Sequence, residues 1–221
     1  MLCLLAAILI VRLLTTTFEP LHSVLGDLAL KATIVVGFLT WARRYMGMSW
    51  QELGLRRADA RAGLRAGLPI AASFAILYAV IAAIPATRSY LPIDGVASDS
   101  VAKRLLDPLV YIPLGTVVFE ESIFRAVLLG VLERAWGQGR AALLWSSVAF
   151  GGWHIPPIIA AHKGGVRTTI GNAGGTFLIT AIGGLLFGYV RQRSKSTVAP
   201  AIGHIATNSF GYLAAIIAWQ L

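Results

Sequence analysis

The chain has 221 residues, of which 57% are apolar and only 13% are charged, and its mean hydropathy is +0.73. A soluble domain carries about 25% charged residues, so the composition excludes an ordinary soluble protein and predicts a membrane protein. The formal net charge is +9, but the basic residues lie in short loops between apolar stretches. This placement excludes a soluble nucleic-acid-binding domain and is typical of the positive-inside pattern of membrane proteins.

The apolar stretches predict an all-α fold, a polytopic transmembrane helical bundle of about seven spans. We expect residues 1–105 to hold the N-terminal transmembrane helices and a basic cytoplasmic loop. Residues 106–221 are expected to form the helical core, and the two parts to make one compact membrane domain. The predicted spans are residues 1–18, 23–42, 64–86, 106–133, 140–161, 172–190 and 197–219.

Two polar stretches separate these spans. Residues 43–63 form the largest polar piece and predict an amphipathic helix on the cytoplasmic surface. Residues 163–175, KGGVRTTIGNAGG, are too polar and glycine-rich for a lipid-exposed helix and predict a loop or re-entrant turn. The sixth span contains Gly184 and Gly188 in G-x-x-x-G spacing, which predicts close helix packing inside the bundle.

The basic residues predict that the amino terminus lies in the cytoplasm. We expect an integral protein of the bacterial cytoplasmic membrane, with anionic lipid headgroups as the counter-charge. Eleven basic residues then fall in cytoplasmic loops: Arg43, Arg44, Arg56, Arg57, Arg61, Arg65, Arg134, Arg140, Arg191, Arg193 and Lys195. Five fall on the opposite side: Arg88, Lys103, Arg104, Lys163 and Arg167.

Three charged residues lie inside the fourth predicted span, at Glu120, Glu121 and Arg125. A charge at the bilayer centre costs roughly 2.5–3.5 kcal/mol on insertion scales, so we expect compensation or a function. Glu121 and Arg125 are four residues apart and can form an ion pair on one helix face. Glu120 points about 100° away and has no partner on its own helix. An unpaired carboxylate suits a group that takes up and releases a proton.

Two later spans each add a histidine. His154 lies in the fifth span, and His204 and Asn208 lie four residues apart on one face of the seventh. An imidazole and a carboxamide supply hydrogen-bond donors suited to a developing oxyanion. A single buried histidine is more often structural, but the combined set favours a hydrolytic site that includes Glu120.

Three segments carry a family resemblance. EESIFR, FGGWH and HIATN resemble the E-E-x-x-x-R, F-x-x-x-H and H-x-x-x-N motifs of the CPBP family. This family comprises the type II CAAX prenyl endopeptidases and their bacterial abortive-infection (Abi) relatives. The motifs occur in the family's order on three separate predicted spans, and the resemblance covers roughly residues 105–215. It implies an intramembrane endopeptidase that hydrolyses a peptide bond of a membrane-associated protein or peptide.

The resemblance also implies roles for the polar residues. Glu120 would be the general base that activates water, and His154 would help to hold that water. His204 and Asn208 would stabilise the oxyanion, while the Glu–Arg pair of the fourth span would shape the site and support the base. The family further implies a site that opens toward the cytoplasm.

The resemblance leaves open whether the site needs a metal ion, because the family is described both as metalloproteases and as metal-independent glutamate proteases. His154, His204 and Glu120 could form a three-ligand zinc site with one open position. The chain has no H-E-x-x-H segment, which would place two histidines on one helix face. We therefore favour a glutamate-type enzyme with no metal or other cofactor, and zinc is the alternative.

Two other functions compete with proteolysis. The polar core could belong to a non-proteolytic membrane protein that serves partner binding or bacteriocin-type immunity. It could also serve a small transporter with the carboxylates as a proton relay. The chain shows neither an internal repeat nor paired broken helices, which disfavours a transporter.

Overall fold

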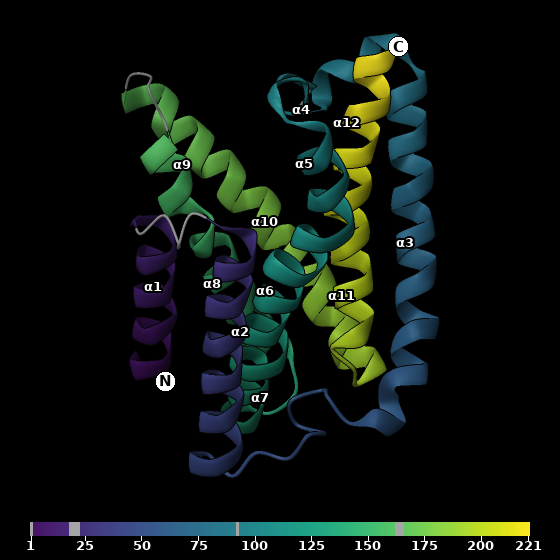
Figure 1. The fold of residues 1–221 in the computed structure, drawn as a ribbon. Coiled ribbons are helices and arrows are strands. Elements are labelled where there is room, and N and C mark those ends of the chain that lie inside the picture. Colours follow the sequence, from purple (N-terminus) through teal and green to yellow (C-terminus); the bar gives the residue numbers. More distant parts are fainter. Residues whose placement is uncertain (1, 18–22, 92, 162–165) are drawn as a thin grey trace.

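The prediction of an all-α bundle is confirmed. The computed structural model describes residues 2–17, 23–91, 93–161 and 166–221, and all regular secondary structure within them is helical. The helices stand side by side, with the two chain ends at opposite ends of the bundle (Figure 1).

The α-helices are α1 (Leu2–Thr17), α2 (Val24–Thr40), α3 (Ala60–Ala83), α4 (Ile93–Ser98), α5 (Val101–Leu106), α6 (Phe119–Glu121), α7 (Leu129–Trp136), α8 (Arg140–Trp153), α9 (Ile155–Ala161), α10 (Val166–Ser194), α11 (Val198–Ile205) and α12 (Gly211–Gln220). Further helical turns are the π-helical η1 (Trp41–Tyr45), η4 (Asp107–Val118), η5 (Ser122–Leu128) and η6 (Ala206–Phe210), and the 3₁₀-helical η2 (Arg57–Asp59) and η3 (Pro85–Tyr90).

The described residues include four helices long and apolar enough to cross a membrane, at Val24–Tyr45, Arg57–Ala83, Val166–Ser194 and Val198–Gln220. The protein is therefore an integral membrane protein, and the predicted count of about seven spans is approximate. The helix that carries the carboxylates is also continuous, from α5 through α7, but its charges interrupt the apolar run. The predicted fifth span is divided into α8 and α9 at His154.

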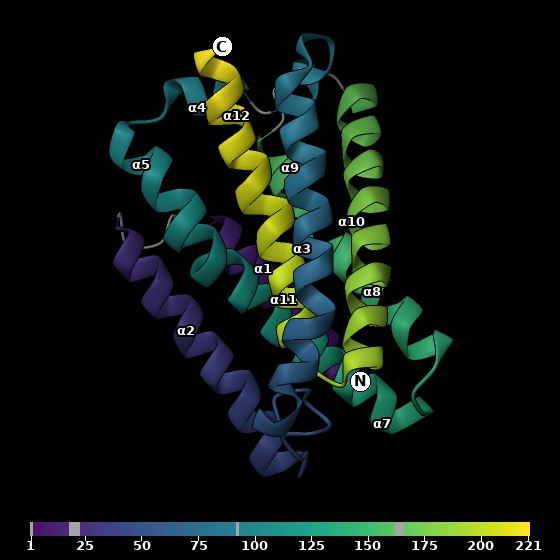
Figure 2. The ribbon, with the colours of Figure 1, turned by 90° about the vertical axis from the view of Figure 1, so that its right-hand side faces the viewer.

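Small residues let the long helices approach one another. Figure 2 shows α3 alongside α11 and α12, with α10 beside them. A Cβ atom added at Gly67 of α3 would lie 2.8 Å from the Ala199 carbonyl oxygen of α11. On α10, a Cβ at Gly184 would lie 3.1 Å from Ser147 Cα of α8. The close packing predicted for the glycine spacing of α10 is thus confirmed inside the bundle.

The amphipathic helix predicted for residues 43–63 is wrong. Beyond η1 the chain forms a loop that tucks under the bundle, and α3 begins only at Ala60. Gly47 and Gly54 adopt φ of +63° and +67°, which glycine enters without steric strain. Met48 and Leu53 are thereby buried completely, and this burial outweighs the gain from a surface helix.

The loop predicted for residues 163–175 is also largely wrong. Residues 162–165 lie outside the described residues, and from Val166 onward the chain is helical as α10. A helix satisfies its own backbone hydrogen bonds, whereas an unsatisfied group in the bilayer costs several kcal/mol. A glycine costs only about 1 kcal/mol in a helix. The helical conformation is therefore lower in free energy than a loop, despite its glycines.

The core surrounds the helix that carries the carboxylates. Every residue from Ile123 to Leu129 has at most 1% exposed surface, and together these seven consecutive side chains point in all directions around the helix axis. A helix that is apolar all round lies inside its protein. In Figure 1, α6 and α7 accordingly run between α2, α8 and α11.

The two glycines of FGGWH provide a matched test of this packing. A Cβ at Gly151 would lie 2.9 Å from the Phe177 carbonyl oxygen of α10, whereas a Cβ at Gly152 would have nothing within 4 Å. Gly151→Ala should lower the free energy of unfolding by about 1–3 kcal/mol through overpacking. Gly152→Ala should leave it unchanged or raise it slightly. Thermal unfolding of the two variants in the same detergent measures this difference, and an equal loss in both would contradict the packing.

Candidate active site

The two glutamates sit in a short α-helical piece between two π-helical segments. Here η4 precedes α6, and η5 follows it. Pro108 and Pro113 lie within η4 and lack the N–H groups that an α-helix would use. Wide π turns are rare and frequently occur at functional sites. The local sequence thus departs from α-helical geometry where the charged residues enter the core.

The carboxylate of Glu120 is held at one oxygen and open at the other. Its Oε1 accepts a hydrogen bond from Trp153 Nε1 at 3.0 Å. Its Oε2 lies 4.0 Å from His154 Nε2 and 3.9 Å from His204 Nε2, and accepts no hydrogen bond from the described residues. These two distances are too long for direct hydrogen bonds, but each can be bridged by one water molecule. The structure therefore brings Glu120, His154 and His204 together around one point.

The other ring nitrogens fix the orientation of both imidazoles. His154 Nδ1 lies 2.8 Å from the Phe150 carbonyl oxygen, and His204 Nδ1 lies 2.8 Å from Glu121 Oε1. A carbonyl oxygen only accepts hydrogen bonds, as does an ionised carboxylate, so Nδ1 carries the proton in each ring. The Nε2 atoms of both rings are left to face Glu120.

The expected ion pair between Glu121 and Arg125 is present. Arg125 Nη1 lies 3.3 Å from Glu121 Oε1, and both side chains are almost fully buried. The guanidinium also packs over the Phe150 ring, with Cζ 4.0 Å from its centroid. Cation–π contact compensates part of the burial of the charge. Glu121 thus links Arg125 on its own helix to His204 on α11.

Asn208 is less closely connected than the other predicted site residues. It lies in η6, four residues after His204, and is half-buried. Within the described part of the chain its side chain makes no hydrogen bond. The structure thus brings His204 into contact with the carboxylates. Asn208 lies on the same helix as His204 but makes no such contact.

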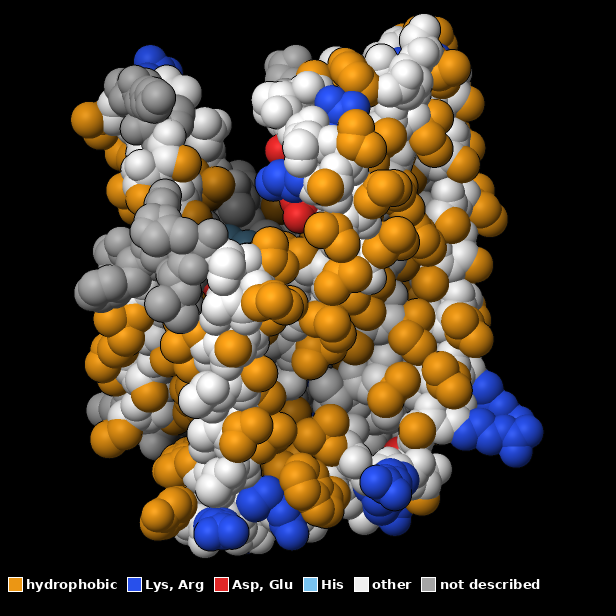
Figure 3. Space-filling view, viewed as in Figure 1, with side chains coloured by type: hydrophobic (Ala, Val, Ile, Leu, Met, Phe, Trp, Pro, Cys, Tyr) orange, Lys and Arg blue, Asp and Glu red, His pale blue; other side chains and the backbone are white. Residues whose placement is uncertain are grey.

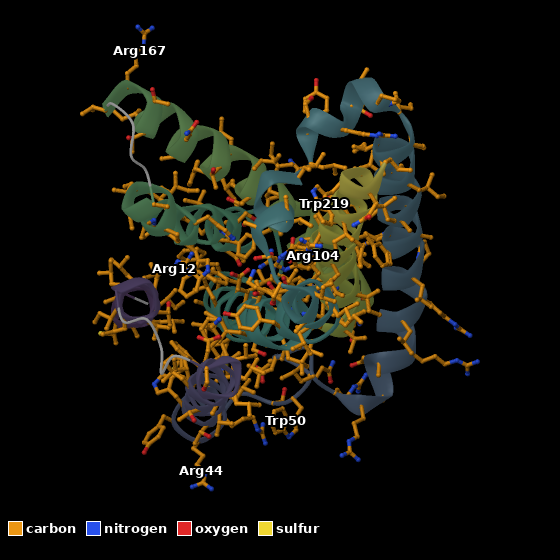
Figure 4. The ribbon with its side chains drawn as sticks, turned by 45° about the horizontal axis from the view of Figure 1, so that its top comes forward. Arg12, Arg44, Trp50, Arg104, Arg167 and Trp219 are labelled. Atoms are coloured by element: carbon orange, nitrogen blue, oxygen red, sulfur yellow. The ribbon has the colours of Figure 1, made fainter. Side chains whose placement is uncertain are left out.

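Two residues that contact the site were not assigned from the sequence. Trp153 donates to Glu120, and Arg12 of α1 donates from Nε to the Trp153 carbonyl oxygen at 2.7 Å. The Arg12 guanidinium also lies 4.6 Å from the Trp153 ring centroid, and Figure 4 shows Arg12 on α1. A buried indole needs an acceptor, and a cation inside an apolar stretch needs a partner. The tryptophan and the arginine within apolar stretches are both visible in the sequence. Neither of them indicates which residue it will contact.

The zinc alternative involves the same three side chains. Within residues 2–17, 23–91, 93–161 and 166–221, no three histidine, cysteine, aspartate or glutamate side chains are arranged to hold a metal ion. The two imidazoles instead face one carboxylate oxygen at 3.9 and 4.0 Å. A bridging water and a metal ion would occupy the same space between these three atoms, so metal removal is the experiment that distinguishes them.

Comparison with protein families gives a match to part of the chain. Residues 104–210 match the family described as Type II CAAX prenyl endopeptidase Rce1-like. No curated protein and no solved structure matched the chain. The matched range contains all three segments that carry the resemblance, together with the polar cluster built above. Residues 104–210 are thus similar to the Rce1-like family of type II CAAX prenyl endopeptidases.

Proposed function

We propose that the protein is a glutamate-type intramembrane endopeptidase that hydrolyses a peptide bond of a membrane-associated protein or peptide. The observation that carries this proposal is the asymmetric carboxylate of Glu120. Trp153 holds one oxygen, while the other faces His154 and His204 at water-bridging distance. We place the enzyme in the bacterial cytoplasmic membrane, where lipid surrounds its apolar helices.

The water-activation step follows from this geometry. A water molecule between the three groups donates one hydrogen to Glu120 Oε2, which removes that proton as the water oxygen attacks the substrate carbonyl carbon. His154 Nε2 accepts the other hydrogen and orients the water, because Nδ1 of that ring already donates to Phe150. Glu120 then passes its proton to the amide nitrogen as the carbon–nitrogen bond breaks. The products are a new carboxyl terminus and a new amino terminus.

His204 is proposed to stabilise the oxyanion of the tetrahedral intermediate. For Nε2 to donate to the oxyanion, the ring must also carry a proton at Nε2. The Glu121 carboxylate at 2.8 Å from Nδ1 stabilises the resulting positive charge. A charge-assisted donor in a water-poor site is among the strongest sources of transition-state stabilisation. The Asn208 amide, on the same helix, is the second proposed donor.

The Glu121–Arg125 pair is proposed to support the site rather than to react. Arg125 keeps Glu121 compensated inside the core, and Glu121 in turn orients His204. The two adjacent carboxylates thus have different roles. The Glu121 carboxylate is neutralised and structural, whereas the Glu120 carboxylate remains available for the proton transfer.

Loss of the Glu120 carboxylate tests the proposed function. We expect Glu120→Gln to lower cleavage about 10²–10⁴-fold, because the amide cannot accept the proton. Amino-terminal proteomics of membranes with matched expression would show new termini with the wild-type protein but not with Glu120→Gln. The control Glu52→Gln alters an exposed loop carboxylate and should retain the termini. Identical termini in the wild-type protein and Glu120→Gln would favour the partner-binding or immunity alternative.

Metal removal tests the glutamate-type mechanism separately. We expect purified protein to cleave a substrate found in this way equally well with and without a strong zinc chelator. The proposed chemistry uses only Glu120, His154 and His204 around the water. Loss of cleavage on chelation, restored by added zinc, would instead establish the metalloprotease alternative.

The proposed supporting role of Arg125 predicts an effect on stability. Arg125→Met leaves Glu121 as a buried charge without its cation, which should lower the free energy of unfolding by about 3–5 kcal/mol. The double variant Arg125→Met/Glu121→Gln should recover part of this loss, because it removes both charges. Denaturant titration in detergent measures both, with the exposed Arg65→Met as a control. An unchanged stability in Arg125→Met would show that the pair does not support the core.

A further inference from the structure

Arg12 is the only charged residue of α1, and its side chain turns inward. Leu4, Ile8 and Arg12 are spaced four residues apart, so they share one face of the helix. Leu4 and Ile8 are buried in the core with 4% and 5% exposure, whereas Leu9 on another face is 53% exposed. Figure 4 shows Arg12 on the side of α1 that faces the other helices. The inner face of α1 therefore carries a cation where its pattern predicts an apolar residue.

Cations elsewhere in the chain gather near the ends of the bundle. On the face shown in Figure 3, lysine and arginine side chains lie toward the two ends, and hydrophobic side chains cover much of the band between them. Arg44, which is exposed in η1, is of this kind and points away from the molecule in Figure 4. A long cationic side chain at such a place reaches water or lipid headgroups. Arg12 lies within an apolar helix, so a partner inside the protein must compensate its charge.

One partner of Arg12 is a backbone carbonyl that the local sequence leaves without its usual donors. In a continuous helix the Trp153 carbonyl oxygen would accept a hydrogen bond from the N–H of residue 157, or of residue 156 in a tighter turn. Both of these residues are prolines, which have no N–H group. Arg12 Nε donates to this oxygen at 2.7 Å. Arg12 thus supplies from α1 the hydrogen bond that Pro156 and Pro157 remove from the junction of α8 and α9.

The same guanidinium also contacts the Trp153 side chain. Arg12 Cζ lies 4.6 Å from the centroid of the indole ring, at a distance where a cation is attracted to the ring face. Phe119 and Phe124 contact the ring as well, with centroids 5.9 and 5.5 Å from that of the indole. Trp153 is only 4% exposed, and its Nε1 donates to Glu120 Oε1 at 3.0 Å. The direction of this hydrogen bond is therefore set by the contacts of the cation and the two phenylalanines with the ring.

We propose that Arg12 is a positioning residue of the active site, which acts on Glu120 through Trp153. By holding both the carbonyl and the ring of Trp153, Arg12 keeps the indole N–H on Oε1 of Glu120. Oε2 then stays directed at the two histidines and the water between them. This inference deepens the proposed function and rests on it in regarding Glu120 as the base. It also extends the site beyond residues 104–210, because α1 lies outside the matched range.

Hydrogen exchange of the indole N–H tests this positioning without requiring activity. The full chain in detergent micelles, with ¹⁵N-labelled tryptophan, should give six indole resonances, and the one that Trp153→Phe removes belongs to Trp153. We expect Arg12→Met to raise the exchange rate of this N–H at least about 10-fold, because the indole then leaves Glu120 more often. The backbone N–H of Trp145, in the middle of α8, is the internal control and should keep its exchange rate.

Two results of the exchange experiment would overturn the proposal. One is an unchanged exchange rate of the Trp153 indole in Arg12→Met. The other is a parallel rise at Trp145, because a general loosening of α8 would then explain the effect. Arg44→Met, which removes an exposed cation, is the matched control variant and should leave both rates unchanged.

Cleavage kinetics test whether the positioning matters for the reaction. With a substrate found by the proteomics, we expect Arg12→Met to lower kcat about 10–100-fold and to change KM less than about 2-fold, since the base is misplaced while substrate contacts remain. Trp153→Phe, which lacks the indole N–H, should lower kcat to a similar extent. Arg12→Met added to Trp153→Phe should cost less than about 2-fold more, because both act through one hydrogen bond. Losses that multiply, or an unchanged kcat in Arg12→Met, would contradict the proposed role.

A second variant covers the case in which Arg12→Met does not fold. Arg12→Gln keeps an N–H donor for the Trp153 carbonyl but removes the cation from the ring, so it should also raise the exchange rate of the indole N–H. An unchanged exchange rate in Arg12→Gln would overturn the role of the guanidinium. The exchange experiment and the Glu120→Gln proteomics fail independently. Selective exchange at Trp153 without any cleavage by the wild-type protein would refute the protease and leave the positioning of Glu120 by Arg12 established.

Discussion

Compensation of charge inside an apolar helix is the constraint on which the rest of the structure depends. Glu120, Glu121 and Arg125 enter the core within two turns, where each uncompensated charge is costly. Arg125 and His204 both contact Oε1 of Glu121 and compensate its charge, while its Oε2 accepts no hydrogen bond from the described residues. Glu120 then receives one hydrogen bond, from Trp153, and keeps one oxygen open. The same arrangement that makes two adjacent glutamates tolerable also leaves one of them available for chemistry.

Small residues determine how close the partner helices can come to these charges. A Cβ at Gly203, next to His204, would lie 3.0 Å from Ile70 of α3 and 3.2 Å from Phe187 of α10. Phe187 in turn stacks on the His204 ring, with centroids 5.1 Å apart. Gly151 plays the corresponding role between α8 and α10. Gly151 and Gly203 therefore act through packing, and this packing fixes the positions of the two imidazoles.

Much of the site could be predicted from the sequence, because its signals are local. Polar residues in apolar spans and a four-residue Glu–Arg spacing identify the cluster without any structure. The contact of Arg12 with Trp153 joins residues far apart in the chain, so no local pattern indicates it. The polar composition of residues 43–63 predicts a surface helix, but it gives no sign that Met48 and Leu53 are completely buried. The way α10 leans away from the other helices (Figure 1) likewise follows from no helix periodicity.

The most direct test of the account is an experimental density map that resolves ordered water around Glu120. The account predicts one water with hydrogen-bond distances of about 2.7–3.2 Å to Glu120 Oε2 and to both Nε2 atoms. It also predicts that Trp153 Nε1 still donates to Oε1. Direct contact of either imidazole with Glu120 Oε2 would contradict the account, because no space for the water would remain. An ion about 2.0–2.1 Å from both Nε2 atoms would contradict it equally, and would make the site a zinc centre.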